Sequence, residues 1–365
     1  MTLRRPLVLA LLAAAVTLPL AVGCSSSPDG TTLAALGPVS GLETTHLTIA
    51  AVPTTDSTGV YVAQYEHLFE KVGLHVTIVP AISAETAVNQ LAYNQIQVLA
   101  GNYVSFIEAQ DHYDGGIRAP KPSSDPNAPP PPAAQIAANL DLFSEASVEQ
   151  PGFVGLYTLP GSPIKNLSQL KGKRIGINAP DNVAYLLTAS FLKDNNIPPN
   201  SVHYVSIPFP SMLDALTRNK VDVAFLAEPF ISIFEQAAGV VQLTNLDTGQ
   251  AAALPIEGYA ATKSFAKANP NTMMAFERAL QQGQEIAATN RQVAEAATVQ
   301  YALLPSMKGA PVKAAQEIAT MLQFETYPLS PVDATRVRRV AEIMQTFGLF
   351  GQNNQTFSIN SMFGT

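Results

Sequence analysis

The stretch between Lys171 and Phe234 constrains the fold more than any other part of this chain. Its hydrophobic pattern switches repeatedly between short apolar runs of strand length and longer runs with helical spacing. The segments are, in order, 174–178 (strand), 183–194 (helix), 202–207 (strand), 212–218 (helix) and 221–226 (strand). Strands that alternate with helices in this way indicate βαβ units and a parallel sheet buried on both faces. Ligands of such sheets bind beyond the carboxyl ends of the strands, so functional residues are expected there.

An earlier stretch repeats this organisation. The apolar run 47–52 is followed by Asp56 and a helical pattern, just as the run 174–177 is followed by Asp181 and a helical pattern. Two copies of this unit predict an α/β fold with two lobes, each a mostly parallel sheet flanked by helices. We expect the two sets of strand ends to enclose a cleft, because clefts between domains are favoured small-molecule sites.

The amino terminus has the pattern of an export signal. Two arginines are followed by a short apolar core and by small residues before the single cysteine, Cys24. The sequence Ala-Val-Gly-Cys at 21–24 resembles the bacterial lipoprotein cleavage motif, although Ala21 stands where that motif usually has Leu. We expect residues 1–23 to be removed and Cys24 to carry lipid; an ordinary signal peptide is the alternative. Acyl chains, rather than a transmembrane span, would then hold the chain at the membrane.

Composition and spacing divide the rest of the chain. A segment rich in Ser, Gly, Pro and Thr predicts a flexible tether after the cleavage site. A proline-rich segment predicts a surface insertion, because proline removes backbone donors. The predicted parts are the tether 24–45, the first lobe 46–150 and 256–350 with its insertion at 115–134, the second lobe 151–255, and a tail 351–365.

Two similar segments are expected to connect the lobes. Gly152–Leu159 and Glu257–Thr262 each combine glycine with aromatic and small apolar residues. We predict that they carry the chain out of the first lobe and back, as a two-segment hinge that permits closure over a ligand. The patterns also predict one helix from Thr58 to Lys71 and a helical region from Pro270 to Phe350.

Composition excludes several classes of function. The net charge is −7 and no basic run occurs, so we expect no nucleic-acid partner. One cysteine leaves no disulfide framework and no cysteine-based zinc site. The five histidines lack metal-binding spacing, and there is no Gly-x-Ser-x-Gly elbow. We therefore expect no metal, no cofactor and no enzymatic activity, and we expect a monomer.

Three phrases of the sequence carry a family resemblance. They are GVYVAQYEHLFEKVGLHVTIV at 59–79, GSPIKNLSQLKGKRIGIN at 161–178 and IPFPSMLDALTRNKVDVAFLAEPF at 207–230. They resemble solute-binding proteins of ABC importers, in the branch that serves nitrate, aliphatic sulfonates and thiamine-pyrimidine precursors. The resemblance implies a periplasmic-binding-protein-like fold of type II with a small molecule in the interlobe cleft. It also implies a membrane permease and its ATPase as partners.

The resemblance also places ligand-facing residues after the strands of both lobes. The positions are Asp56, Ser57, Ser83, Glu85, Gly101 and Asn102 in the first lobe, and Asn178, Asp181, Asn182, Phe209 and Glu228 in the second. Ala-Glu-Pro-Phe at 227–230 matches the family pattern, whereas Pro-Asp-Asn at 180–182 departs from the small residues that anion-binding members have there. Asp181 or Asn182 alternatively caps the helix that follows.

The charge of these positions bears on the ligand. They include four carboxylates and no Arg or Lys, whereas a desolvated sulfonate or nitrate needs a cation or several donors. The inventory favours a neutral or cationic nitrogen-bearing molecule, such as a pyrimidine or another vitamin precursor, stacked on Tyr or Phe. The alternatives are import of a sulfonate- or nitrate-type anion, and a receptor that senses its ligand without transport. An enzyme is the last alternative: a fungal pyrimidine synthase resembles this branch, but it relies on a Cys-rich motif that the mature chain lacks.

Overall fold

The computed structural model describes residues 36–121, 135–180, 182–329, 332–349 and 358–363. Several predictions lie outside these residues. They are the signal peptide, the lipidated Cys24, the ligand residue Asp181 and most of the proline-rich insertion.

The first sheet has five strands in the order β2-β1-β3-β10-β4. The strands are β1 (His46–Ala51), β2 (His75–Pro80), β3 (Val98–Asn102), β4 (Leu140–Val148) and β10 (Pro255–Thr262). β1 pairs in parallel with β2 and β3, while β10 is antiparallel to both of its neighbours. Four strands therefore point one way and β10 points the other, so the carboxyl ends of β1, β2, β3 and β4 meet at one edge.

The second sheet repeats this topology in the order β7-β6-β8-β5-β9. Its strands are β5 (Val154–Thr158), β6 (Arg174–Ile177), β7 (His203–Ser206), β8 (Val223–Ala227) and β9 (Val241–Asn245). β6 pairs in parallel with β7 and β8, and β5 runs antiparallel between β8 and β9. The predicted α/β fold with two mostly parallel sheets is confirmed.

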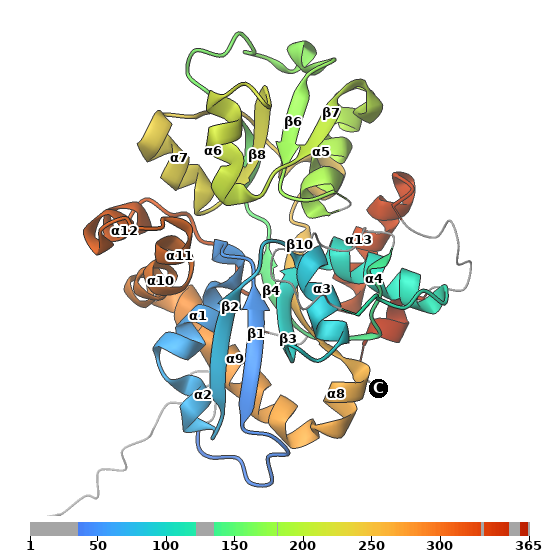
Figure 1. The fold of residues 1–365 in the computed structure, drawn as a ribbon, viewed down its shortest axis with the longest axis vertical. Coiled ribbons are helices and arrows are strands. Elements are labelled where there is room, and N and C mark those ends of the chain that lie inside the picture. Colours follow the sequence, from blue (N-terminus) through green and yellow to red (C-terminus); the bar gives the residue numbers. More distant parts are fainter. Residues whose placement is uncertain (1–35, 122–134, 181, 330–331, 350–357, 364–365) are drawn as a thin grey trace, which may run out of the picture. The chain divides into compact units, whose positions relative to one another are not determined.

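Helices cover both faces of the first sheet, because its strands carry apolar side chains on both sides. Leu47 and Ile49 pack on the side of α1, α2 and α9, whereas Ala50 and Leu99 pack on the side of α3, α4 and α13 (Figure 1). Successive side chains of a strand point to opposite faces, so apolar residues at every position bury the sheet on both sides. These helices are α1 (Thr58–Tyr65), α2 (Leu68–Lys71), α3 (Ala84–Ala92), α4 (Tyr103–Asp114), α9 (Pro270–Thr289) and α13 (Ala334–Thr346).

The second sheet is flanked by the helices that its own connections supply. They are α5 (Val183–Asp194), α6 (Phe209–Thr217) and α7 (Phe230–Ala238). The remaining helices are α8 (Lys263–Ala268), α10 (Arg291–Thr298), α11 (Leu304–Ser306) and α12 (Val312–Ala319), with a π-helical turn at Val299–Leu303. α12 contacts α7, and α13 contacts both α4 and α5. No helix in the described part of the chain has the length and hydropathy needed to cross a bilayer.

Two details of the predicted chain path were wrong. The two segments expected to form the hinge are strands of different sheets: β5 lies within 152–159, and β10 contains 257–262. Their full backbone pairing leaves the loops 149–153 and 246–254 as the connections between the sheets. The single helix expected from Thr58 to Lys71 is two helices, because His67 adopts a left-handed conformation with φ +55° and interrupts it.

Candidate functional site

A cavity of about 200 Å³ lies where the strand ends of the two sheets meet. Its wall is almost entirely apolar and comes from both sheets. The lining residues are Val52 and Pro53 after β1, Pro80, Ala81 and Ile82 at the end of β2, Pro208, Phe209 and Pro210 after β7, Phe230 of α7, and Pro305, Ser306 and Lys308 beside α11. The carboxyl ends of parallel strands are the expected ligand position in α/β sheets. Of the predicted site residues, only Phe209 is in this lining.

Two aromatic rings form the wall contributed by the second lobe. Phe209 and Phe230 stack with centroids 5.0 Å apart and an interplanar angle of 16°. Phe209 also stacks on Phe225 of β8, at 6.3 Å. Phe209 is held in place because Pro208 and Pro210 flank it at the start of α6, where proline is compatible with a helix. A planar or apolar group therefore finds a preformed surface here.

Three consecutive residues shortly after the cavity-lining Val52 and Pro53 bring three carboxylates together: two of them bind a glutamate through a hydroxyl, and the third is an aspartate. Ser57 Oγ donates to Glu257 Oε2 at 2.9 Å, and Thr55 Oγ1 donates to Glu325 Oε1 at 2.8 Å. Between them, Asp56 Oδ1 accepts from Ser147 Oγ at 2.7 Å. The short 3-10 turn Thr55–Ser57 thus gathers carboxylates from three parts of the chain. Backbone pairing fixes this geometry, because Glu257 of β10 is the register partner of Ser147 on β4.

A fourth carboxylate joins these three from the connection between the sheets. Glu149 follows β4 directly, is 1% exposed, and neither of its carboxylate oxygens has a hydrogen-bond partner. Its backbone N–H donates to Leu254 O at 3.0 Å, which ties the two interlobe connections together. We call Asp56, Glu149, Glu257 and Glu325 the acid cluster. No ion pair in the described part of the chain links the acid cluster to a Lys, Arg or His side chain.

Burial and mutual repulsion disfavour the charged forms of the acid cluster. Burial is the main cause that raises the pKa of each carboxyl group. The negative charge of Asp56 further raises the pKa values of Glu149, Glu257 and Glu325. Asp247, in the other interlobe connection, adds to the effect on Glu149. The cluster therefore favours bound protons or a positively charged partner.

Glu228 connects the two lobes through its backbone, and its carboxylate contacts the start of the helix that follows it. Its carbonyl oxygen accepts a hydrogen bond from Thr55 N at 3.1 Å. Its carboxylate accepts from Ser232 N at 3.2 Å and from Ser232 Oγ at 2.9 Å, at the first turn of α7. Burial raises the pKa of Glu228 to about 7, although the bonds from Ser232 oppose the shift. The predicted ligand residue Glu228 thus contacts its own helix in this structure.

Three other predicted site residues cap helices. Ser83 accepts from Thr86 N at the start of α3, and Asn102 accepts from Ser105 N at 3.0 Å at the start of α4. Asn182 accepts from the backbone N–H groups of residues 184 and 185, so it has the capping role that the sequence left open. Its amide also donates to Asn178 Oδ1 at 2.9 Å. A side chain that satisfies helix N–H groups has less capacity left for a ligand.

The last two predicted residues pack inside the first lobe. Glu85 accepts a hydrogen bond from Ser105 Oγ, and its other carboxylate oxygen has no partner. A Cβ at Gly101 would come within 2.9 Å of Ala84 Cβ, so this glycine allows α3 to approach β3. The structure therefore divides the predicted residues. Asp56 and Ser57 lie at the acid cluster, Phe209 lines the cavity, and the others described here are capping or packing residues; their roles toward a ligand stay predictions.

The sequence prediction did not include Glu149, Glu257, Glu325 or Lys308. Glu257 had a usable signal, since it is a charged residue inside the otherwise uncharged strand PIEGYAAT, where burial of a charge is costly. Glu325 lies between the helices expected at 311–323 and 331–347, where the chain pairs with β4 through Val148 and Thr326. No set of three or more His, Cys, Asp or Glu side chains among the described residues is arranged to hold a metal ion.

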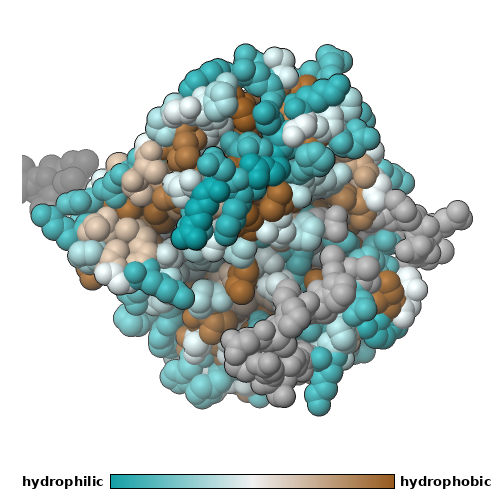
Figure 2. Space-filling view, turned by 45° about the horizontal axis from the view of Figure 1, so that its top comes forward, coloured by the Kyte–Doolittle hydropathy of each residue, from teal (hydrophilic) through white to brown (hydrophobic). Residues whose placement is uncertain are grey.

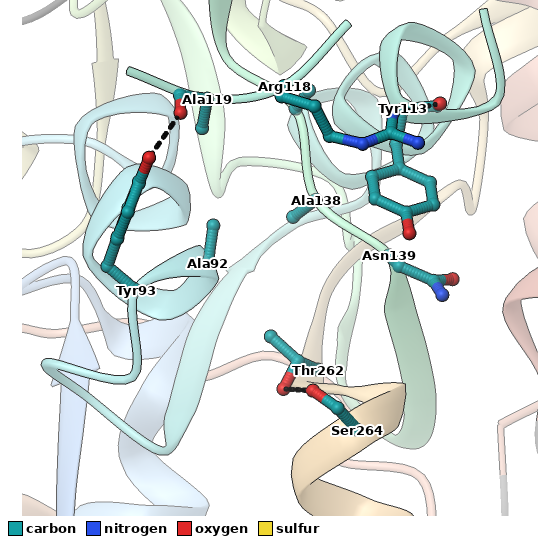
Figure 3. Close-up of a pocket in the computed structure, with 10 residues that line it drawn as sticks. Ala92, Tyr93, Tyr113, Arg118, Ala119, Ala138, Asn139, Thr262 and Ser264 are labelled. Atoms are coloured by element: carbon teal, nitrogen blue, oxygen red, sulfur yellow. Dashed lines mark hydrogen bonds between the residues drawn. The ribbon is translucent and has the colours of Figure 1, made fainter. Parts of the chain in front are cut away.

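A second cavity, of about 240 Å³, lies at the opposite edge of the first sheet. Figure 3 shows the Tyr93 hydroxyl directed at Ala119 O, at 2.7 Å, and the Arg118 guanidinium over the Tyr113 ring, 4.0 Å from its centroid. Arg118 also donates to the carbonyl oxygens of Tyr113 and Ile117. Asn139 precedes β4, so this cavity is at the amino ends of the parallel strands, away from the expected ligand edge.

The visible surface offers no single large apolar area. On the face in Figure 2, hydrophobic residues form separate patches between hydrophilic side chains. Exposed large apolar residues of the described chain include Ile82 at 65%, which lies at the edge of the interlobe cavity. The cavity between the strand ends is therefore the best-supported ligand position in the described residues.

Comparison with known proteins supports the family resemblance. Residues 130–294 match the family model NMT1/THI5 like. The search of curated proteins found no match. The alkanesulfonate-binding protein SsuA from Xanthomonas axonopodis pv. citri, bound to MOPS, is similar with a TM-score of 0.63 and 14% identity over 85% of this chain and 96% of that one.

Two further solved structures are similar over most of their length. The periplasmic nitrate-binding protein NrtA from Synechocystis PCC 6803 has a TM-score of 0.63 and 11% identity, over 88% of this chain and 85% of that one. A Candida albicans protein with the generic periplasmic binding protein fold has a TM-score of 0.61 and 16% identity, over 87% and 96%. The predicted resemblance to binding proteins of the nitrate, sulfonate and thiamine-precursor branch, on a periplasmic-binding-protein fold, is confirmed.

Proposed function

We propose that this chain, whose residues 130–294 match an NMT1/THI5-like model on a periplasmic-binding-protein fold, is the solute-binding component of an ABC importer. One observation carries the proposal: a preformed cavity between the strand ends of two sheets, walled by residues from both. The structurally similar proteins are described as binding alkanesulfonate or nitrate, and they give the proposal its transport context. The partners would be a permease and its ATPase, and the chain has no catalytic role.

The proposed location is the outer face of the cell membrane. The export signal and the motif at Cys24 predict a diacylated cysteine as the mature amino terminus. The residues between Cys24 and the first lobe would act as a tether that lets the receptor reach its permease.

The proposed ligand is a small nitrogen-bearing molecule of the vitamin or pyrimidine-precursor type. Stacked Phe209 and Phe230 suit a flat ring, and the acid cluster beside the cavity suits nitrogen donors rather than an anion. Lys308 favours a second candidate, a sulfonate- or nitrate-type anion, because it is the one charged residue in the cavity lining.

Mass spectrometry of small molecules that remain bound through purification tests the function. The full chain is purified from its own host without denaturation, and released compounds are compared with those from a Phe230→Ala variant. We expect one compound class at near-stoichiometric yield with the natural protein and a large loss with the variant. Equal, substoichiometric traces from both proteins would contradict a binding function for this cavity. Uptake of the compound that depends on this gene would separate transport from sensing.

A further inference from the structure

Glu145, another buried acid of the same sheet, shows how this fold can neutralise a buried carboxylate with a cation. Glu145 of β4 is 0% exposed, and Arg336 of α13 contacts both of its carboxylate oxygens at 3.2 and 2.5 Å. The acid cluster lies near the end of the same strand but has only hydroxyl partners: those of Ser57, Ser147, Thr55 and Tyr327. Burying a carboxylate without a countercharge is costly, so we expect a positively charged group from outside the chain to neutralise this cluster.

Glu149 indicates where that charge would sit. Its side chain is buried and its two oxygens make no hydrogen bond, although every other member of the acid cluster has at least one hydroxyl donor. Ser147 and Glu149 flank Val148, and Glu325 and Tyr327 flank Thr326, which pairs with Val148. In this antiparallel pairing Glu149 and Glu325 are neighbours on adjacent segments, and both lie close enough to Asp56 to feel its charge. Glu149 thus adds free acceptor oxygens to a site that already has hydroxyl-held carboxylates.

The acid cluster and the apolar cavity adjoin each other along the chain. Val52 and Pro53 line the cavity and lead directly into the turn that holds Asp56. On the second lobe, Phe230 lines the cavity two residues after Glu228, whose carbonyl accepts from Thr55. None of the four carboxylates lines the cavity itself, so a ligand there would reach the acid cluster only through a polar arm directed along the turn at 53–56.

We propose that the ligand carries a positively charged nitrogen group that the acid cluster binds, with its apolar or aromatic body in the cavity that Phe209 and Phe230 line. This inference rests on the proposed solute-binding function and specifies its substrate class. A cation with N–H donors supplies the countercharge and satisfies the free oxygens of Glu149. Because burial and repulsion raise the pKa values of the acid cluster, the entering cation displaces protons from it.

Three probes that share a benzyl group and differ in the charge of the attached group test the inference. Benzylammonium, benzyl alcohol and phenylmethanesulfonate are titrated into the full chain by calorimetry at neutral pH. We expect benzylammonium to bind more tightly than the alcohol by about tenfold or more, as a charge-assisted contact implies. We expect the sulfonate to bind more weakly than the alcohol. Titrations in buffers of different ionisation enthalpy should show proton release for the cation only.

A matched pair of variants assigns the effect to the cluster. Glu149→Gln removes one carboxyl group that can ionise when the cation enters, and it should weaken benzylammonium binding by about tenfold while leaving the alcohol unchanged. Glu342→Gln, on the exposed side of α13, should change neither. Proton release by the natural protein gives an independent readout should Glu149→Gln fold poorly.

The outcomes separate this inference from the function it rests on. Alcohol or sulfonate binding as tight as that of the cation contradicts the cationic ligand and leaves solute binding intact. If no probe binds, the molecule retained through purification decides: a cation supports the inference, and a neutral or anionic compound overturns it. Absence of both probe binding and any retained compound contradicts the inference and the proposed function together.

Discussion

Glu228 shows how one buried carboxylate makes stability depend on pH. Burial raises its pKa from the ordinary value of 4.5 to about 7 in the folded protein. The folded state therefore binds more protons than the unfolded state between these two values. By linkage, the free energy of unfolding falls as the pH rises through that window. A shift of this size corresponds to on the order of 3 kcal/mol, since one pKa unit is about 1.4 kcal/mol.

We predict that Glu228→Gln flattens this part of the pH dependence. The amide cannot ionise, so the variant should gain stability relative to the natural protein as the pH rises from about 5 to about 8. Urea unfolding at several pH values measures the difference. Glu342→Gln serves as the exposed control and should follow the natural protein. An unchanged slope for Glu228→Gln would show that this carboxyl group titrates normally.

Substitutions at Asn182 test whether its side chain stabilises the protein as a helix cap. It is fully buried and accepts two backbone N–H groups at the start of α5. We predict that Asn182→Ala lowers the free energy of unfolding by about 1 kcal/mol, whereas Asn182→Ser retains most of it because serine also caps. Chemical denaturation of both variants checks this. Equal losses for alanine and serine would mean that the amide contact with Asn178, rather than the cap, is what stabilises the site.

At the scale of elements, the crossing of α1 and α9 depends on two glycines. A Cβ at Gly283 would lie 2.4 Å from Gly59 O and 2.7 Å from Ala63 Cβ. A Cβ at Gly59 would lie 2.5 Å from Gln284 Cγ. Glycine is a poor helix former, so its presence inside both helices is explained by this close approach.

We predict that Gly283→Ala destabilises the protein by about 2 kcal/mol, as overpacking of a buried contact does. The sign is informative because alanine has the higher helix propensity and would stabilise an unconstrained helix. Thermal or urea unfolding measures the change. Met274→Ala, at a half-exposed position of the same helix, should stay within about 0.5 kcal/mol. A stabilised Gly283→Ala protein would contradict the close crossing.

The elements also show what local sequence pattern can predict. α5 begins and ends where the helical spacing indicated, at Val183 and Asp194. The segments 152–159 and 257–262 were predicted in the lobes whose sheets hold β5 and β10, and the chain does connect the lobes twice. The prediction that these segments form the connections themselves overlooked their strand pairing, which joins residues far apart in sequence. His67 broke a helix without a Gly or Pro signal.

At the scale of the whole molecule, the same distinction applies to the site. The edge of the sheets that holds the cavity was predictable, because strand ends follow from the βαβ pattern; Phe209 lines the cavity, and Asp56 and Ser57 lie in the turn that follows β1. The acid cluster was not predictable in full: Glu149, Glu257 and Glu325 come from three segments that only the folded chain brings to Asp56. Residues such as Ser83 and Asn182 have the same polar character at strand ends, yet they cap helices.

Anchoring by lipid is the prediction that concerns the whole chain. Cys24 is the single cysteine, and it follows an export signal with small residues at the cleavage position. Two acyl chains bury enough hydrocarbon to hold a protein at a bilayer, whereas the described chain contains no helix that could span one. We predict that the natural protein partitions with membranes and into detergent, and that Cys24→Ser shifts it to the aqueous phase. Mass spectrometry of the mature amino terminus provides the control, since a lipidated cysteine must appear there. A natural protein that starts at another residue, or that stays aqueous, would show that export occurs without an anchor and that the receptor meets its permease by free diffusion.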